Sequence, residues 1–361
     1  MKLQRIAGSL LVPLLLAACE DARIGGLELD VARAPSQALS VMTWNVYYGT
    51  DLNAVVTALG NADPTDDIPA FIGALTTLEA TAWPARAEAI AAAIAAERPH
   101  VVGLQEIATY DIDLSGLGVP IDFTLPFLPI LEAALANRGL NYQVAAMVES
   151  FHAQPAPGVS VRDFNVLLVD ADRVEVLDTR AQRFAAGIGP VAPGVALYDG
   201  WVAADVRVKD AVYTIVNTHL TAGAGEQLSG LRYLQATELV QTIGAASPAI
   251  VMGDLNDVSG SLMHQVFQGA GFADAWQDMR PGVEGLTCCQ RADLANDASA
   301  LDTRYDYILV RGIGTGHAGL QGKIDRVGAN PSSKVVGPAG PLWPSDHAGL
   351  VARFVIPPSQ R

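Results

Sequence analysis

Apolar residues fall into short runs separated by polar turns from residue 39 onward. The shorter runs are β-branched or fully apolar and predict strands, whereas the longer Ala- and Leu-rich runs predict helices. The predicted strands are Leu39–Val46, Val101–Leu104, Tyr142–Val148, Asn165–Val169, Arg173–Leu177, Gly200–Val208, Val212–Asn217, Ala249–Met252, Ile308–Val310 and Gly349–Phe354. The predicted helices are Pro84–Glu97, Pro126–Arg138, Leu228–Thr242 and Ser261–Gly269.

The order of these elements indicates the fold class. Several strands follow one another directly, joined by turns at Asp170–Asp172 and Lys209-Asp210, and helices intervene elsewhere. This mixture favours packed sheets covered by helices over a simple doubly wound parallel sheet. We therefore expect an α/β chain of the α+β kind, with no composition break that would divide the part after the N-terminal segment.

The N-terminal residues have a separate pattern. Lys2 and Arg5 precede the apolar run Ile6–Ala18, which is too short to span a bilayer and is typical of a secretory signal. The run ends in Leu16-Ala17-Ala18-Cys19, which resembles the lipobox of bacterial lipoproteins. That resemblance implies a signal peptide at 1–18, acylation of Cys19, a tether at 19–37 and a domain at 38–361. The protein would be exported and anchored to a membrane of the cell envelope through Cys19, or secreted if the lipobox is not used.

Composition narrows the possible partners. With a net charge of −15, the chain lacks the excess of basic residues expected of a protein that binds nucleic acid by electrostatic attraction. It leaves a nuclease possible, because bound divalent cations can bridge an acidic cleft to phosphate. Apart from Cys19, the only cysteines are the neighbours Cys288 and Cys289. Adjacent cysteines close only a strained ring, so two free or buried thiols are expected, although an export compartment permits disulfides.

Six short stretches with acidic, amide or histidine side chains stand directly beside the apolar runs. Their side chains therefore lie at strand ends, where a rigid sheet can hold them in one cleft. The six stretches are Thr43-Trp44-Asn45, Gln105-Glu106, Asn217-Thr218-His219, Gly253-Asp254-Leu255-Asn256, Tyr305-Asp306-Tyr307 and Ser345-Asp346-His347.

Two of these positions suggest a metal site. Asn45 and Glu106 offer hard oxygen ligands, which suit Mg²⁺, with Mn²⁺ or Ca²⁺ as alternatives, better than zinc. Taken alone, Asn45 is better explained as a strand-end turn residue and Glu106 as a solvated strand-end acid.

The histidines suggest acid–base chemistry. Asn217 stands two residues before His219, and Asp346 directly precedes His347, at two strand boundaries. Such pairs favour one shared acid–base system over isolated structural histidines. Asp254 and Asn256 lie two residues apart, so both side chains share a side if the strand continues; otherwise they form a simple turn.

The ordered set resembles the motif series of the endonuclease/exonuclease/phosphatase superfamily, which includes deoxyribonuclease I, and the resemblance spans residues 39 to 356. It implies a four-layer sandwich, with two mainly antiparallel sheets face to face and helices outside. It also implies that Glu106 binds the metal with Asn45 beside it, and that Asp346 is placed to touch the metal.

The same resemblance implies catalytic roles. Asp254 would orient or deprotonate the attacking water, and Asn256 would hold the phosphate. His347, with Asp346, would stabilise the charged transition state. His219 would contact a phosphate oxygen or donate a proton, and Asp306 would orient an imidazole or the leaving group.

Substrate contacts are less sharply marked. The stretch Arg162–Leu168 differs from the Tyr-x-Gly-Val-type strand of abasic-site endonucleases. Arg162, Asn165 and Asn217 are the residues expected on the substrate side, with a polar strand entry as the alternative for the first two. Ala108–Pro129 is interpreted as an insertion over the cleft or as a packed surface loop.

Three functions therefore compete, and the first of them is favoured. The first is a metal-dependent phosphodiesterase or nuclease, and the second is a sphingomyelinase or phospholipase C-like enzyme acting on a phospholipid headgroup. The third is a binding module that has lost catalysis, against which the retained Glu106, His219, Asp254 and His347 argue. No protein partner is implied.

Overall fold

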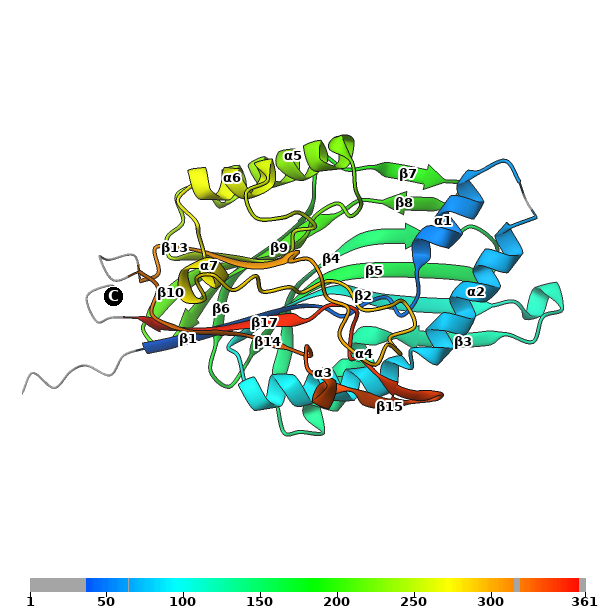
Figure 1. The fold of residues 1–361 in the computed structure, drawn as a ribbon, viewed down its shortest axis with the longest axis horizontal. Coiled ribbons are helices and arrows are strands. Elements are labelled where there is room, and N and C mark those ends of the chain that lie inside the picture. Colours follow the sequence, from blue (N-terminus) through cyan, green and yellow to red (C-terminus); the bar gives the residue numbers. More distant parts are fainter. Residues whose placement is uncertain (1–36, 64, 315–318, 357–361) are drawn as a thin grey trace, which may run out of the picture. The chain divides into compact units, whose positions relative to one another are not determined.

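The computed structural model describes residues 37–63, 65–314 and 319–356, and most of their strands belong to two large sheets (Figure 1). Sheet A contains, in spatial order, β14 (Gly322–Val327), β17 (Gly349–Ile356), β1 (Gln37–Asn45), β2 (Val101–Asp113), β5 (Val159–Asp170), β4 (Tyr142–Ala153), β8 (Val195–Leu197) and β7 (Gly189–Ala192), with β3 (Asp122–Pro126) also paired to β2. Sheet B contains β12 (Ala273–Asp274), β13 (Asp306–Arg311), β11 (Ala249–Asp254), β10 (Ala211–His219), β9 (Gly200–Val208) and β6 (Glu175–Arg183). A separate hairpin joins β15 (Val335–Gly337) to β16 (Gly340–Leu342).

Seven α-helices accompany the sheets within the described residues. They are α1 (Leu52–Gly60), α2 (Asp67–Ala80), α3 (Trp83–Glu97), α4 (Phe127–Ala136), α5 (Glu226–Ile243), α6 (Leu262–Gly269) and α7 (Ala275–Met279), with 3₁₀ turns at Ser115–Leu117 and Pro331–Ser333. In this part of the chain, none of the helices is both long and apolar enough to cross a bilayer. The expected signal peptide, Cys19 and residues 20–36 lie outside the described residues.

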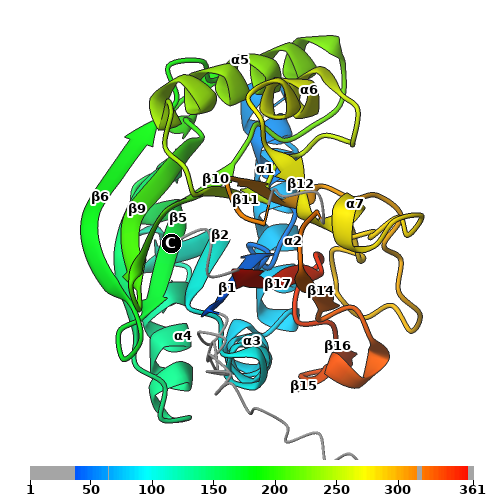
Figure 2. The ribbon, with the colours of Figure 1, turned by 90° about the vertical axis from the view of Figure 1, so that its left-hand side faces the viewer.

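The two sheets pack face to face, and helices cover their outer faces. One core cluster lies between the sheets, a second joins sheet A to α3 and α4, and a third joins sheet B to α5 and α6. Strand β11 has apolar residues on both sides, because Ile250 and Met252 enter the core between the sheets while Val251 packs in the cluster of α5 and α6. In Figures 1 and 2, α5 and α6 lie on one side of the sheets and α3 and α4 on the opposite side. The predicted four-layer sandwich is confirmed.

The pairing within these sheets is mixed but mainly antiparallel. Among the pairs formed by the described strands of sheets A and B, only β1–β2 and β10–β11 run parallel. At the other edge of β1, the C-terminal strand β17 pairs antiparallel with it, so the two ends of the described chain share one sheet.

The predicted helices are present as α3, α4, α5 and α6, with ends shifted by a few residues at most. Several strands are longer than their apolar runs. In particular, β2 continues to Asp113 and turns back into β3. Much of Ala108–Pro129, which we interpret from the sequence as an insertion or a surface loop, is therefore a β-hairpin. Helices α1 and α2 were not anticipated. Helix α2 leaves Ile68 and Ile72 exposed, at 68% and 55%, so its apolar residues do not mark one buried face.

A buried histidine next to β2 makes folding stability sensitive to pH. His100 Nδ1 accepts a hydrogen bond from the Ser40 backbone N–H (3.1 Å), and burial, with Arg173 next, lowers its pKa from 6.5 to about 4. Between these values the unfolded chain binds more protons than the folded one, so acidification favours unfolding. We expect wild type to lose about 1–2 kcal/mol more than His100→Gln between pH 7 and 4. Urea unfolding at each pH tests this, and the half-buried surface substitution His152→Gln should keep the wild-type slope.

Candidate active site

Three of the motif residues form a row at one end of sheet B. His219 is the last residue of β10, Asp254 the last of β11 and Asp306 the first of β13. The strand register pairs His219 with Asp254 and Asp254 with Asp306. Adjacent strands therefore bring an imidazole and two carboxylates together from segments far apart in the sequence.

Sheet A contributes its residues from β1 and β2. Asn45 ends β1, whereas Glu106 lies inside β2, where the register with β5 shifts between Leu104 and Ile107. Glu106 has a φ of +61°, which a non-glycine residue seldom adopts. The irregularity re-aims the carboxylate out of the regular pleat, as β-bulges beside active sites do. The expectation that β2 ends before Glu106 is therefore wrong.

The Asn45 amide connects the two sheets at this point. Its Nδ2 donates to Glu106 Oε1 (2.8 Å) and to Asp254 Oδ2 (3.0 Å). Its Oδ1 accepts from the Tyr47 backbone N–H (3.0 Å), which fixes the orientation of the amide. One buried side chain thus holds a carboxylate of sheet A close to a carboxylate of sheet B.

Glu106 lies in an environment that would favour a cation. Its Oε2 accepts from the Tyr48 backbone N–H (2.9 Å). Burial first, and then the Asp346 carboxylate, raise the Glu106 pKa from 4.5 to about 8. Burial likewise raises the Asp346 pKa, against the opposing influence of His347 and then Arg86. Glu106 and Asp346 thus form an oxygen-rich site in which ionising both carboxylates is unfavourable. A divalent cation would stabilise the doubly ionised form.

Asp254 lies between two imidazoles. Its Oδ2 is 3.6 Å from His219 Nε2 and 3.7 Å from His347 Nε2. Burial alone would lower both histidine pKa values, but the neighbouring carboxylates raise them, led by Asp254 for His219 and by Asp306 for His347. Both imidazoles are therefore stabilised in their charged form next to the Asp254 carboxylate.

The His347 ring is oriented by Asp306. His347 Nδ1 lies 2.8 Å from Asp306 Oδ2, so the other ring nitrogen, Nε2, is directed towards Asp254. Asp306 is held in turn by its backbone N–H, which donates to Thr287 Oγ1 (3.1 Å). Ser345 Oγ donates to the Asn45 carbonyl (2.6 Å) and anchors the segment before His347.

Asn256 follows Asp254 in a left-handed conformation with a φ of +50°. Its backbone N–H donates to Asp254 Oδ1 (3.0 Å), and its Nδ2 donates to the Leu220 carbonyl (3.0 Å). Gly253 has a φ of +149°, and a Cβ there would lie 1.8 Å from the Thr218 carbonyl. Only glycine permits this approach between β11 and β10, which aligns Asp254 with His219.

The residues expected on the substrate side occupy different environments. Arg162 is exposed, with its guanidinium 5.8 Å from the Phe164 ring centroid. Asn165 is fully buried and donates to the Gly200 carbonyl (3.0 Å). Asn217 is also fully buried, and its Nδ2 donates to the Leu104 and Val166 carbonyls, both at 3.0 Å. Both side-chain amides therefore form hydrogen bonds from one sheet to the other.

Several residues near the site were missed by the sequence reasoning. Arg86 is fully buried and donates to the Val46, Tyr47 and Pro344 carbonyls, which join the segments that carry Asn45 and His347. The sequence feature that could have identified Arg86 is a charged residue within an Ala-rich predicted helix. Asp163 accepts from Tyr48 and from Ser150 and lies near His219, but no motif marks it.

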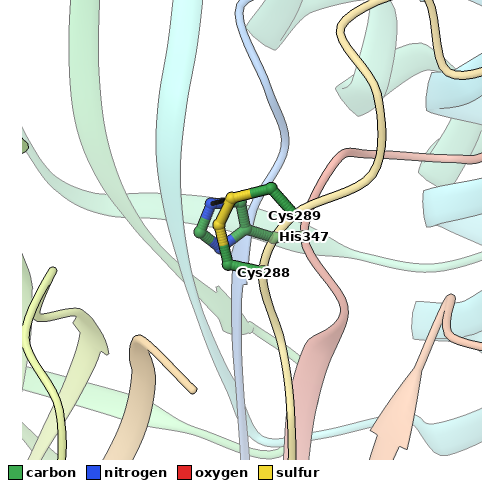
Figure 3. Close-up of side chains that lie close together, drawn as sticks. All are labelled: Cys288, Cys289 and His347. Atoms are coloured by element: carbon green, nitrogen blue, oxygen red, sulfur yellow. Dashed lines mark hydrogen bonds between the residues drawn. A yellow bond between two sulfur atoms is a disulfide. The ribbon is translucent and has the colours of Figure 1, made fainter. Parts of the chain in front are cut away.

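The adjacent cysteines also belong to this neighbourhood. Cys288 and Cys289 are joined in a disulfide, which corrects the expectation of two free thiols. Cys289 Sγ lies 3.8 Å from His347 Nε2 (Figure 3).

The sequence of the chain matches a known family along most of its length. The model of the endonuclease/exonuclease/phosphatase family matches residues 42–347, a range that includes the cluster from Asn45 to His347. The chain belongs to this family. Members of the family typically depend on a metal, and the described residues contain a buried Asp254–Asp306–His347 cluster.

Solved structures agree with the fold of this family member. An endonuclease/exonuclease/phosphatase from Beutenbergia cavernae is 20% identical over 89% of this chain and 72% of its own, with a TM-score of 0.57. The human Nocturnin catalytic domain with bound sulfate is 19% identical over 88% and 94%, with a TM-score of 0.55. D. rerio TDP2 complexed with a single-strand DNA product is 18% identical over 88% and 99%, with a TM-score of 0.51. No curated protein sequence matches the chain.

Proposed function

We propose that the protein is a divalent-cation-dependent phosphodiesterase that uses water for in-line attack on phosphorus. The observation that carries the proposal is the position of Asp254. Its carboxylate lies within 3.7 Å of two imidazole nitrogens and is joined through Asn45 to the Glu106 carboxylate. A base, two cationic groups and a cation-binding carboxylate thus surround one small region.

Asp254 is the base in this proposal. It would orient the attacking water and accept its proton, while Asn256 helps to hold the phosphate. The two imidazolium groups neutralise the charge that develops on the phosphoryl oxygens, and His219 can also donate a proton to the leaving oxygen. Asp306 keeps His347 in the required orientation through its contact with Nδ1.

Glu106 and Asp346, with Asn45 beside them, would hold the metal. This donor set fits Mg²⁺, and Mn²⁺ or Ca²⁺ as alternatives, because hard cations prefer carboxylate and amide oxygens. When bound, such an ion polarises a phosphoryl oxygen and neutralises its charge. The Asp254–Asp306–His347 group could also hold an ion, but the close contact of Asp306 with His347 Nδ1 leaves that carboxylate engaged, so we favour the Glu106 site.

A nucleic acid strand is the proposed substrate. The structurally similar D. rerio TDP2 has been solved with a single-strand DNA product, which supports a phosphodiester of this kind. The net charge of −15 opposes long-range attraction of nucleic acid, so recognition would be confined to the phosphates close to the metal site.

Hydrolysis at a phospholipid headgroup is the second candidate, and it is favoured by an apolar groove that suits the acyl chains of a lipid. The groove, of about 650 Å³, is bordered by α2 and the β2–β3 hairpin, which continues the strand that carries Glu106. Its apolar lining includes Ile72, Leu75, Trp83, Ile121, Phe123 and Leu125.

The experiment that separates these functions is a hydrolysis panel. Plasmid DNA, single-strand DNA, RNA, sphingomyelin and bis-p-nitrophenyl phosphate are each incubated with Mg²⁺ or with EDTA. We expect Mg²⁺-dependent cleavage of DNA or RNA that falls by roughly 10²–10³-fold in His347→Ala. Cleavage of sphingomyelin alone would favour the second candidate. A folded wild-type protein that cleaves none of them would overturn the proposal and favour a binding role.

We further propose that the protein is exported and lipid-anchored through Cys19. The sequence Leu16-Ala17-Ala18-Cys19 supports this assignment. After expression in a bacterium that processes lipoproteins, wild type should be in the membrane fraction, and Cys19→Ala should lose lipid labelling and leave that fraction. Ser36→Ala, with an equally small change near the end of the tether, is the matched control. Equal lipid labelling of wild type and Cys19→Ala would contradict the anchor.

A further inference from the structure

The loop that carries the cysteine pair is bonded to the segment that carries His347. The Ala348 N–H donates to the Thr287 carbonyl (2.8 Å), and the Gln290 N–H donates to the Asp346 carbonyl (2.8 Å). These two bonds flank the cysteines on one segment and His347 on the other. Backbone hydrogen bonds on both sides therefore join the two segments. Figure 3 shows the two sulfurs beside the imidazole.

The three side chains present a soft donor set. The Cys288 and Cys289 sulfurs and a His347 ring nitrogen lie within 4.8 Å of one another, and Cys289 Sγ lies 3.8 Å from Nε2. Cys288 is buried, whereas Cys289 is exposed and can be reached from solvent. Two sulfurs and an imidazole nitrogen suit thiophilic cations, unlike the oxygen donors of Glu106 and Asp346.

The orientation of His347 also fits a metal ligand. Its Nδ1 lies 2.8 Å from Asp306 Oδ2, so Nδ1 can donate a hydrogen bond to the carboxylate, and Nε2 becomes a ligand when a cation displaces its proton. A carboxylate that fixes the ring through the other nitrogen is the usual partner of a metal-binding histidine. Nε2 is the nitrogen that faces Cys289.

We propose that Cys288, Cys289 and His347 Nε2 form, once the disulfide is reduced, an inhibitory site for a thiophilic divalent cation of the zinc and cadmium class. Reduction by a water-soluble phosphine breaks the S–S bond, yields two thiols and oxidises the phosphine to its oxide with oxygen from water. Binding of the cation then displaces the two thiol protons and the Nε2 proton of the charged imidazole, and Nε2 donates the freed lone pair to the cation. The disulfide form has no thiolate to offer and does not bind.

Occupation of this site would remove His347 from hydrolysis. The imidazole cannot ligate a cation through Nε2 and also contact a phosphoryl oxygen with that nitrogen. This inhibition rests on the proposed function, whereas binding of the cation does not. The oxidised protein should therefore tolerate thiophilic cations that inhibit the reduced protein.

Cadmium titration tests binding directly. Full-length protein is reduced with the phosphine, desalted without oxygen and titrated with Cd²⁺ in excess Mg²⁺, while cadmium–thiolate ultraviolet absorption and calorimetry are recorded. We expect one Cd²⁺ per reduced chain, bound at least 100-fold more tightly than by the oxidised chain. Cys289→Ser should lose at least 100-fold in affinity, and Cys19→Ser should keep the wild-type stoichiometry. His347→Asn should weaken binding at least 10-fold without removing the thiolate absorption.

Four results would overturn the inference. They are no cadmium–thiolate absorption in the reduced protein, equal binding by the oxidised protein, full affinity in a folded Cys289→Ser protein, or unchanged affinity in His347→Asn. Hydrolysis is measured separately, and we expect one equivalent of Cd²⁺ to inhibit the reduced enzyme at least 10-fold and the oxidised enzyme less than 2-fold. Binding without inhibition of an active enzyme would overturn the inhibitory role. Failure of the hydrolysis panel would overturn the proposed function and leave the binding result intact.

Discussion

Asp254→Asn is expected to lower kcat/KM for phosphodiester hydrolysis by roughly 10³–10⁴-fold, since the amide cannot accept a proton from water. The change preserves the size of the side chain, and the asparagine oxygen can still accept from Asn45 Nδ2 at the 3.0 Å position of Oδ2. It also removes the negative charge between the two imidazoles, so His219 and His347 lose part of their stabilisation as cations. Steady-state kinetics at saturating Mg²⁺ measure the effect.

The control for this variant is Asp205→Asn in the same sheet. Asp205 belongs to β9 and accepts hydrogen bonds from Thr214 and Arg180, outside the proposed catalytic cluster. We expect Asp205→Asn to change kcat/KM less than 3-fold. A folded Asp254→Asn enzyme that keeps a tenth or more of the wild-type kcat/KM would remove Asp254 from the role of base.

Glu106→Gln is expected to abolish stabilisation of the fold by Mg²⁺ and to lower kcat/KM by at least about 10³-fold. A ligand that binds only the folded state stabilises it by about 2.7 kcal/mol at 100 times its Kd, and the wild type should approach this value. The neutral glutamine keeps a similar shape but offers no negative charge. Thermal unfolding across an Mg²⁺ series measures the difference.

Wild type and Glu106→Gln should also differ in how their folding stability depends on pH when EDTA removes the metal. The folded-state pKa of Glu106, about 8, lies above its ordinary value of 4.5, so the folded protein binds the proton more tightly than the unfolded chain does. The stability that this protonation contributes is fully present below pH 4.5 and is lost as the pH rises through 8. Glu106→Gln should lack this loss, and the exposed Glu175→Gln should behave as wild type. Equal Mg²⁺ stabilisation of Glu106→Gln and wild type would exclude Glu106 as a ligand.

The sequence pattern was most informative at strand ends. Asn45, His219 and Asp254 each close an apolar run, and the structure has each of them as the last residue of a strand. The central runs of β9, β10 and β11 are recognisable because their apolar side chains pack into the core clusters on both faces of sheet B. The fold class and the convergence of these residues could therefore be predicted.

Long-range details could not be read in the same way. The bulge at Glu106 depends on pairing between β2 and β5, which no local pattern reveals. Asn217 precedes His219 in a polar motif, yet its amide is bonded to the Leu104 and Val166 carbonyls, and a Cβ at Gly103 would lie 2.6 Å from its Oδ1. A motif shows that a polar residue is needed. Only the packing of the two sheets shows whether its side chain points to the active site or to the opposite sheet.

The pairing of β17 with β1 has a consequence for biosynthesis. Strand β1 is made early, but its antiparallel partner and the neighbouring His347 come from the last segment of the described chain. A nascent chain that stops before Gly349 contains every described strand of sheet B, yet it lacks the strand that covers one edge of β1. Hydrolytic activity would therefore arise only at the end of synthesis, and an exported chain would remain inactive until its C-terminal segment had followed it across the membrane.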